Sequence, residues 1–185
     1  MSVIKPRFIV IDDMRGEASR VISAIKEYDP EADVKIESSH PFFFEKLIEA
    51  NREAGGLFAI PQPTIVLLDG DMAADYTELT SWENENLFPG GKSEFYQKTD
   101  EWEVSKWDNS KGARKILDKF KNEIGPFISP LVSGKVTEPN RYPDDWDKNP
   151  QALSSLNCPI SFNKKEFSAI DVKHLVKYLG ELTTL

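Results

Sequence analysis

The sequence predicts an α/β fold: a doubly wound, five-stranded parallel sheet with both faces covered by helices. Two observations support this prediction. Five short runs rich in apolar residues are spaced along the chain, and apolar residues at helical spacing lie between them. Such alternation is typical of parallel strands joined by right-handed crossovers. A chain of 185 residues is long enough for one well-buried core and too short for two ordinary domains.

Three strands and two helices are predicted in the amino-terminal part of the chain. The strands cover residues 8–11, 32–36 and 64–68, and the first and third are continuous in apolar residues, as in a buried parallel sheet. The first helix ends at Asp29-Pro30, and its inner face carries Ala18, Val21, Ile22 and Ile25. The second helix covers residues 42–52 before Gly55-Gly56, and its inner face carries Phe43, Phe44, Leu47 and Ile48.

The remaining elements follow a polar, irregular segment. A helix is predicted from Ser110 to Gly125, with Ala113, Ile116, Leu117, Phe120 and Ile124 inward. Strands follow at 127–132 and 159–162, with a short helix between them from Asn149-Pro150 to about residue 156. The last helix begins at Ser168, has Asp171 in the capping-box position, and is expected to bury Ile170, Leu175, Val176 and Leu179. We predict a single domain over residues 1–185, with insertions at about 72–110 and 135–148.

Composition excludes several classes of function. The formal net charge of −8 argues against a nucleic-acid-binding surface, because such binding depends on lysine and arginine at phosphates. Cys158 is the only cysteine, so the chain can form neither an internal disulfide nor a cysteine metal cluster. We find no apolar signal segment at the amino terminus and no apolar run long enough to span a bilayer. The expected location is therefore cytoplasmic, with no membrane partner.

Candidate site residues follow the first, third, fourth and fifth predicted strands. Asp12 and Asp13 follow the first strand, Asp69 the third, Ser133 the fourth and Lys164 the fifth. Ligands of such sheets bind at the carboxyl ends of the strands, so we expect these side chains to meet in one pocket. Three clustered carboxylates repel one another, and Mg²⁺ with oxygen ligands would relieve that repulsion. A carboxylate can also attack phosphorus to give an aspartyl phosphate.

These motifs resemble the receiver domains of two-component response regulators. The resemblance is carried by Ile9-Val10-Ile11-Asp12-Asp13, Ile65-Val66-Leu67-Leu68-Asp69-Gly70-Asp71-Met72, Leu131-Val132-Ser133-Gly134 and Phe162-Asn163-Lys164. It covers most of the chain except the two irregular segments. It implies a flavodoxin-like (CheY-like) sheet of order 2-1-3-4-5. It also implies a histidine kinase or phosphotransfer protein as phosphodonor and a downstream protein partner.

The resemblance also implies a role for each site residue. Asp69 would be the phosphoacceptor, with Ser133 and Lys164 beside the phosphoryl group. Asp12, Asp13 and Asp69 would hold Mg²⁺, together with the backbone carbonyl of Asp71. The chain would then not be an enzyme beyond phosphorylating and dephosphorylating itself at Asp69.

The sequence departs from the family at several positions. Ala73 stands where a proline is usual, and some forty residues separate Asp69 from the matching helix. The usual Lys-Pro is Lys164-Lys165. We assign the role to Lys164 because an apolar residue, Phe162, stands two positions earlier, and Lys165 remains an alternative. Ser161 occupies a position that often carries an aromatic side chain in the family.

Other functions remain open. A degenerate receiver would keep the fold, lack phosphorylation and act as an interaction module. A metal-dependent phosphohydrolase is suggested by Asp69-Gly70-Asp71, which resembles the Asp-x-Asp of haloacid-dehalogenase-like enzymes. Those enzymes, however, carry their nucleophile on the first strand. The aromatic residues of segment 72–110 fit a local core, a partner surface or a lid over the acidic pocket.

Overall fold

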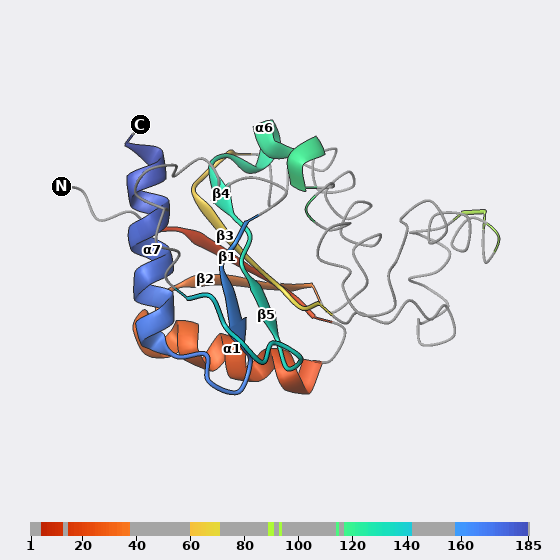
Figure 1. Ribbon diagram of the computed structural model, residues 1–185. Coiled ribbons are helices and arrows are strands. Elements are labelled where there is room, and N and C mark those ends of the chain that lie inside the picture. Colours follow the sequence, from red (N-terminus) through yellow and green to blue (C-terminus); the bar gives the residue numbers. More distant parts are fainter. Residues whose placement is uncertain are drawn as a thin grey trace.

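The computed structural model describes residues 5–12, 15–37, 60–70, 89–90, 93, 114, 117–141 and 158–184. Its strands are β1 (Arg7–Ile11), β2 (Asp33–Glu37), β3 (Thr64–Leu68), β4 (Phe127–Ile128), β5 (Leu131–Ser133) and β6 (Ser161–Asn163). All their pairings are parallel. The order across the sheet is β2-β1-β3-β5-β6, and β4 pairs with β3 (Figure 1). With β4 and β5 sharing one position, this is the predicted order 2-1-3-4-5, and the flavodoxin-like fold is confirmed.

The fourth predicted strand, 127–132, is interrupted, which corrects the prediction of one continuous strand. β4 pairs with the start of β3, whereas β5 pairs with its last residue, Leu68. Pro130 lies in the break, and proline cannot donate the hydrogen bond that a central strand requires. Its carbonyl still accepts a 3.0 Å hydrogen bond from the N–H of Leu68. The segment therefore stays beside β3 across the break.

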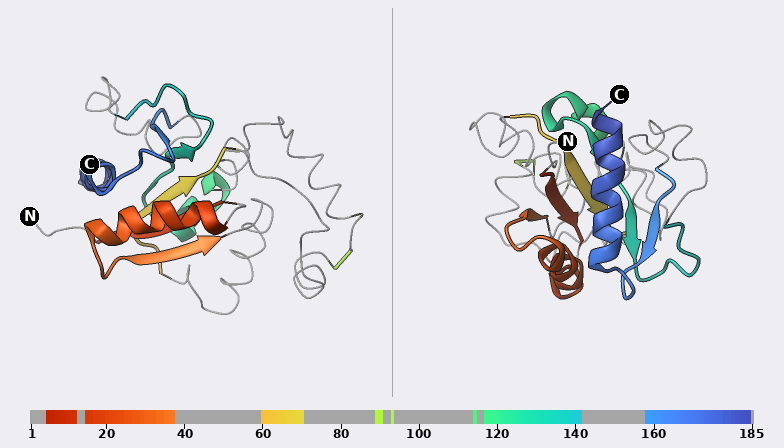
Figure 2. Two further views of the ribbon diagram at one scale, coloured as in Figure 1. Left: turned by 90° about the horizontal axis from the view of Figure 1, so that it is seen from below. Right: turned by 90° about the vertical axis from the view of Figure 1, so that its left-hand side faces the viewer.

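Three helices have described bounds: α1 (Arg15–Tyr28), α6 (Lys121–Ile124) and α7 (Ala169–Thr183). Residues 117–119 are also helical, in agreement with the helix predicted before Gly125. α1 and α7 lie on the same face of the sheet (Figures 1 and 2). The helices predicted at 42–52 and 149–156 lie outside the described residues, as does most of segment 72–110.

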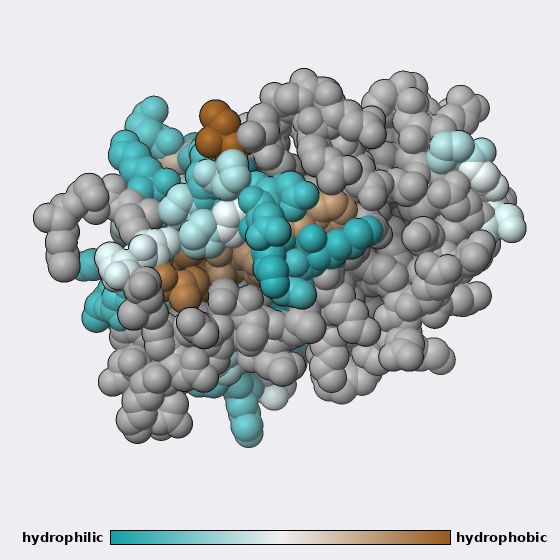
Figure 3. Space-filling view, turned by 90° about the horizontal axis from the view of Figure 1, so that it is seen from above, coloured by the Kyte–Doolittle hydropathy of each residue, from teal (hydrophilic) through white to brown (hydrophobic). Residues whose placement is uncertain are grey.

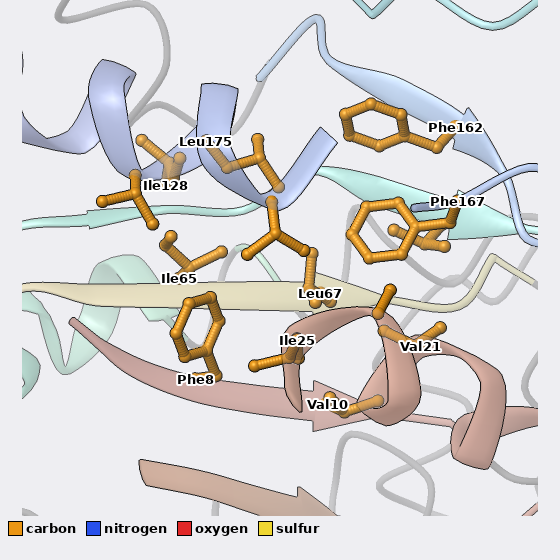
Figure 4. Close-up of a cluster of buried hydrophobic side chains, with 14 of the residues drawn as sticks. Phe8, Val10, Val21, Ile25, Ile65, Leu67, Ile128, Phe162, Phe167 and Leu175 are labelled. Atoms are coloured by element: carbon orange, nitrogen blue, oxygen red, sulfur yellow. The ribbon is translucent and has the colours of Figure 1, made fainter. Parts of the chain in front are cut away.

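Both faces of the sheet are buried, because the side chains of β1 and β3 alternate between two cores. One face packs against α1 and α7 (Figure 4), and its members include Phe8, Val10, Val21, Ile25, Ile65, Leu67, Phe162 and Leu175. The opposite face contains Ile9, Ile11, Val66, Leu68, Leu117, Phe120, Ile124 and Phe127. Burial on two sides explains why these strands are continuous in apolar residues.

The start of α7 confirms the predicted capping box and corrects one predicted core position. The backbone N–H and the hydroxyl of Ser168 both donate to Asp171 Oδ2, at 2.9 and 3.0 Å. Leu175 and Leu179 are buried as expected, but Ile170 is 66% exposed. Ile170 lies two positions before the buried Val172, which is about 200° around the helix and therefore on the solvent side.

The described surface carries few large apolar side chains. Ile60 and Ile170 are the exposed large hydrophobic residues among those described. On the face seen from above, the coloured residues are mainly hydrophilic, with a few hydrophobic ones among them (Figure 3). No helix within the described ranges is both long and apolar enough to cross a membrane.

Candidate functional site

The pairing of β1 with β3 brings two predicted acidic residues together. Ile11 and Leu68 are paired in register, and the N–H of Asp69 donates to the carbonyl of Ile11 at 2.9 Å. Asp12 and Asp69 follow these paired residues directly, so both lie at the same end of adjacent strands. Both carboxylates are buried. Sheet register, rather than a local motif, therefore creates the acidic pair.

The pairing of β5 with β6 places Ser133 and Lys164 at the same edge. Ser133 is paired with Asn163, and the N–H of Lys164 donates to the carbonyl of Ser133 at 3.2 Å. The Ser133 hydroxyl also lies near Gly70, since a Cβ placed on that glycine would be 3.7 Å from Oγ. The hydroxyl therefore borders the loop that follows Asp69.

The ammonium of Lys164 joins the acids into one cluster. Its Nζ lies 2.7 Å from Asp12 Oδ2, 3.0 Å from Glu17 Oε2 and 3.5 Å from Asp69 Oδ1. The side chain of Lys164 is only 3% exposed, whereas Lys165 is exposed to solvent. The structure thus places Lys164, and not Lys165, in the candidate site.

The carboxylate of Asp69 is held by its neighbours. Its Oδ1 accepts a 2.9 Å hydrogen bond from the N–H of Gly70 and lies 3.5 Å from the Lys164 ammonium. Carboxylate oxygens can attack an electrophilic phosphorus, so Asp69 has the chemistry of a nucleophile at the end of this strand. The N–H donor and the ammonium would also stabilise additional negative charge there.

The cluster contains hard oxygen donors and an excess of negative charge. Three carboxylates, those of Asp12, Glu17 and Asp69, surround one ammonium. Mg²⁺ prefers such carboxylate ligands. Within the described part of the chain, however, no three acidic, histidine or cysteine side chains are arranged to hold a metal ion. The other predicted metal ligands, Asp13 and the carbonyl of Asp71, lie outside the described residues.

The surroundings of Lys164 shift its pKa upward. Burial by itself lowers the pKa of an ammonium, but here the hydrogen bond to Asp12, the charge of Asp69 and the hydrogen bond to Glu17 together outweigh it. The lysine is therefore charged over the whole physiological range.

This raised pKa predicts a loss of stability at high pH. A group with a higher pKa in the folded state stabilises the fold below about pH 10.4, the ordinary lysine value, and loses that effect as the pH rises through the folded-state pKa. We expect the free energy of unfolding to fall more steeply in this range for the wild type than for Lys164→Met. Urea titrations between about pH 9 and pH 11.5 would measure both slopes, and equal slopes would contradict the prediction.

Glu17 is a site residue that the sequence analysis missed. It lies in the first turn of α1, five residues after Asp12, and contacts Lys164 from the solvent side. Side chains of a helix tilt toward its amino terminus, so an acidic residue in the first turn after a site strand points back toward the site. This positional signal was available in the sequence.

The outer edge of β6 is covered by residues 136–141. The N–H of Ser161 donates to the carbonyl of Asn140, and the N–H of Asn140 donates to the Ser161 hydroxyl, both at 3.0 Å. Asn163 Nδ2 donates to the carbonyl of Val136 at 2.8 Å. Ser161, where the receiver family often has an aromatic residue, therefore binds the segment that follows the strand end of Ser133. Along these residues, the edge is not open for pairing with another strand.

No family model and no curated protein matches this sequence. Two solved structures align with most of the chain. One is the receiver domain of the histidine kinase CKI1 from Arabidopsis thaliana, complexed with Mg²⁺ and BeF₃⁻, with 12% identity and a TM-score of 0.47 over 99% of this chain and 93% of that one. Another is the Mn²⁺-bound form of response regulator Rcp1, with 12% identity and a TM-score of 0.39 over 97% and 94%. Because both TM-scores are below 0.5, we assign the fold from the strand order and register of this chain and not from these alignments.

Proposed function

We propose that the chain is a receiver domain in signal transduction, in which Asp69 accepts a phosphoryl group in a Mg²⁺-dependent reaction. One observation carries the proposal: three strand ends bring two buried carboxylates, Asp12 and Asp69, to a single buried ammonium. The Lys164 nitrogen lies 2.7 Å from the first and 3.5 Å from the second. This arrangement lies at the carboxyl edge of the sheet, where ligands of such folds bind.

The proposed reaction uses one nucleophile and two charge-stabilising groups. A carboxylate oxygen of Asp69 bonds to phosphorus as the bond from phosphorus to the donor's leaving group breaks, which leaves an acyl phosphate on Asp69. The Lys164 ammonium and the Ser133 hydroxyl pair with the transferred oxygens. Mg²⁺, when bound by Asp12 and Asp69, supplies further neutralisation of charge. In this proposal, Asp13 and the Asp71 carbonyl complete the metal site, as the family resemblance implies.

The proposed output is a change in protein–protein contact. Phosphorylation adds charge and acceptor oxygens, which can shift a loop or helix between two arrangements. The phosphodonor would be a histidine kinase or phosphotransfer protein. The output would be binding to a downstream protein. The chemistry of the chain would be limited to its own phosphorylation and dephosphorylation at Asp69.

Acetyl phosphate labelling tests the proposal. In the presence of Mg²⁺, we expect intact-protein mass spectrometry to show the addition of one phosphoryl group, and we expect chelation of Mg²⁺ to prevent it. Asp69→Asn should abolish labelling, whereas Asp118→Asn, a matched change at an exposed aspartate, should leave it unchanged. A folded wild-type protein that stays unlabelled with Mg²⁺ and acetyl phosphate would remove the phosphoacceptor function.

A degenerate receiver is the second candidate, and the contacts of Lys164 favour it. Lys164 is closer to Asp12 and Glu17 than to Asp69, so the ammonium binds these two carboxylates more closely than that of the proposed acceptor. This candidate predicts an interaction partner whose binding is unaffected by Asp69→Asn. The phosphohydrolase alternative is not favoured, because Asp69 follows β3 and not the first strand.

A further inference from the structure

The carboxylate partners of Lys164 differ sharply in exposure. Asp12 and Lys164 form a contact in which both side chains are almost completely buried. Glu17 reaches the same ammonium at 3.0 Å from the first turn of α1, but its side chain is 50% exposed. The lysine is thus held by one internal acid and by one acid at the boundary with solvent.

The present arrangement leaves Lys164 too far from Asp69 for a strong hydrogen bond. Charge-assisted N–H···O contacts are about 2.7–2.9 Å long, and the Lys164–Asp69 distance is 3.5 Å. An ammonium has three N–H donors, and here it donates hydrogen bonds to Asp12 and Glu17. Its third N–H remains for oxygens on Asp69, but two carboxylates already share the charge of the ammonium, so release of one of them would strengthen its pairing with new oxygens there.

Glu17 is the partner that is easier to release. A half-exposed carboxylate regains water when its ion pair breaks, so the exchange costs little. Breaking the contact with Asp12 would instead cost more, because both side chains are almost completely buried and would not regain water. The lysine therefore has one permanent and one exchangeable carboxylate partner.

We propose that Glu17 competes with the phosphoryl group on Asp69 for Lys164 and so opposes phosphorylation of the resting site. This inference rests on the proposed function. Glu17 is a positioning residue: it acts through the ammonium and touches neither phosphorus nor the attacking oxygen. When an anionic group is attached to Asp69, Lys164 releases Glu17 to water and pairs with the new oxygens.

Beryllofluoride binding tests this competition, since beryllofluoride is an analogue of a phosphoryl group bound to aspartate. Glu17→Gln keeps the size of the side chain and removes its charge. We expect it to bind beryllofluoride about two- to fivefold more tightly at saturating Mg²⁺, the range expected for loss of one exposed ion pair. Calorimetric titration would measure this affinity, and the rate of acetyl phosphate labelling should rise by a similar factor.

Glu27→Gln provides the matched control. Glu27 is an exposed residue of the same helix, ten positions further on and about 15 Å away along the helix axis. Glu27→Gln makes the same change in net charge as Glu17→Gln, at a site remote from Lys164. It should therefore leave beryllofluoride affinity unchanged. A second control examines the pair itself: the shift in denaturation midpoint caused by Glu17→Gln should disappear in a Lys164→Met background.

The outcomes separate this inference from the function on which it rests. If the wild type binds beryllofluoride and Glu17→Gln binds it equally or more weakly, the competition is wrong and the receiver function stands. The competition is also wrong if Glu27→Gln raises the affinity as much as Glu17→Gln does. If no folded variant binds beryllofluoride or is labelled, the phosphoacceptor function itself is wrong, and the competition is overturned with it.

Discussion

Replacing Lys164 by methionine is expected to lower the free energy of unfolding by about 3–5 kcal/mol, the usual cost of removing one partner from a buried ion pair. The ammonium is 3% exposed and lies within 3.5 Å of both Asp12 and Asp69. Methionine has similar length and fills the space, so the loss comes from the charge and not from a cavity. In a domain of this size, the melting temperature should fall by roughly 6 °C or more. Denaturant titration and thermal melts near neutral pH would measure both effects.

The adjacent lysine supplies the control for this change. Lys165 is exposed, and Lys165→Met should alter the free energy of unfolding by no more than about 0.5 kcal/mol. Equal effects of the two substitutions would contradict the placement of Lys164 in the site. The pair of variants also decides between the two lysines in the phosphorylation reaction, because only Lys164→Met should reduce labelling.

Magnesium should partly rescue Lys164→Met. The substitution leaves the carboxylates of Asp12 and Asp69 without their shared cation, and a bound divalent ion would compensate the same charge. Ligands that bind only the folded state raise its stability. We therefore expect Mg²⁺ to raise the melting temperature of Lys164→Met more than that of the wild type. An equal response of the two proteins would argue against a metal site at these carboxylates.

The sheet was predictable because its strands are buried on both faces. Short apolar runs such as 64–68 are typical of buried parallel strands, and β3 has those bounds. The break in the fourth strand was less visible, although Pro130 was a signal for it. Ile170 was placed inward by its apolar character, whereas the rotation of α7 directs it outward. Helix boundaries and faces depend on packing partners that a single segment does not reveal.

The core of the candidate site was predictable for a geometric reason. Parallel strands end at the same edge, so Asp12, Asp69, Ser133 and Lys164 had to approach one another once the strand order was correct. Glu17 was not predicted, because it belongs to a helix and reaches the site only through the direction of its side chain. Its position in the first turn after β1 was a signal in the sequence. The distance to Lys164 is what identifies it as a site residue.

Replacing Gly125 by alanine should lower the free energy of unfolding by about 3 kcal/mol, the upper end of the cost of a strained backbone residue, at the end of β3 opposite the candidate site. Gly125 follows α6 with φ 92° and ψ −168°, a region that only glycine adopts without strain. A Cβ at this position would lie 2.8 Å from the backbone nitrogen of Gln62 and 2.9 Å from its oxygen. The N–H of Gln62 donates to the carbonyl of Ile124 at 3.1 Å, so the clash falls on a contact that joins α6 to the start of β3. Urea titration would measure the loss.

Gly134→Ala is the matched change, because a Cβ on Gly134 would meet no atom within 4 Å. It should alter the free energy of unfolding by no more than about 0.5 kcal/mol, and an equal loss in both variants would contradict the steric argument. Gly125 adjoins the start of β3, whereas Asp69 follows its end, about 17 Å away along the strand. The folded fraction of Gly125→Ala should therefore bind beryllofluoride with wild-type affinity. Together with Lys164→Met, this variant separates loss of stability from loss of the site: one substitution weakens the fold alone, and the other weakens both.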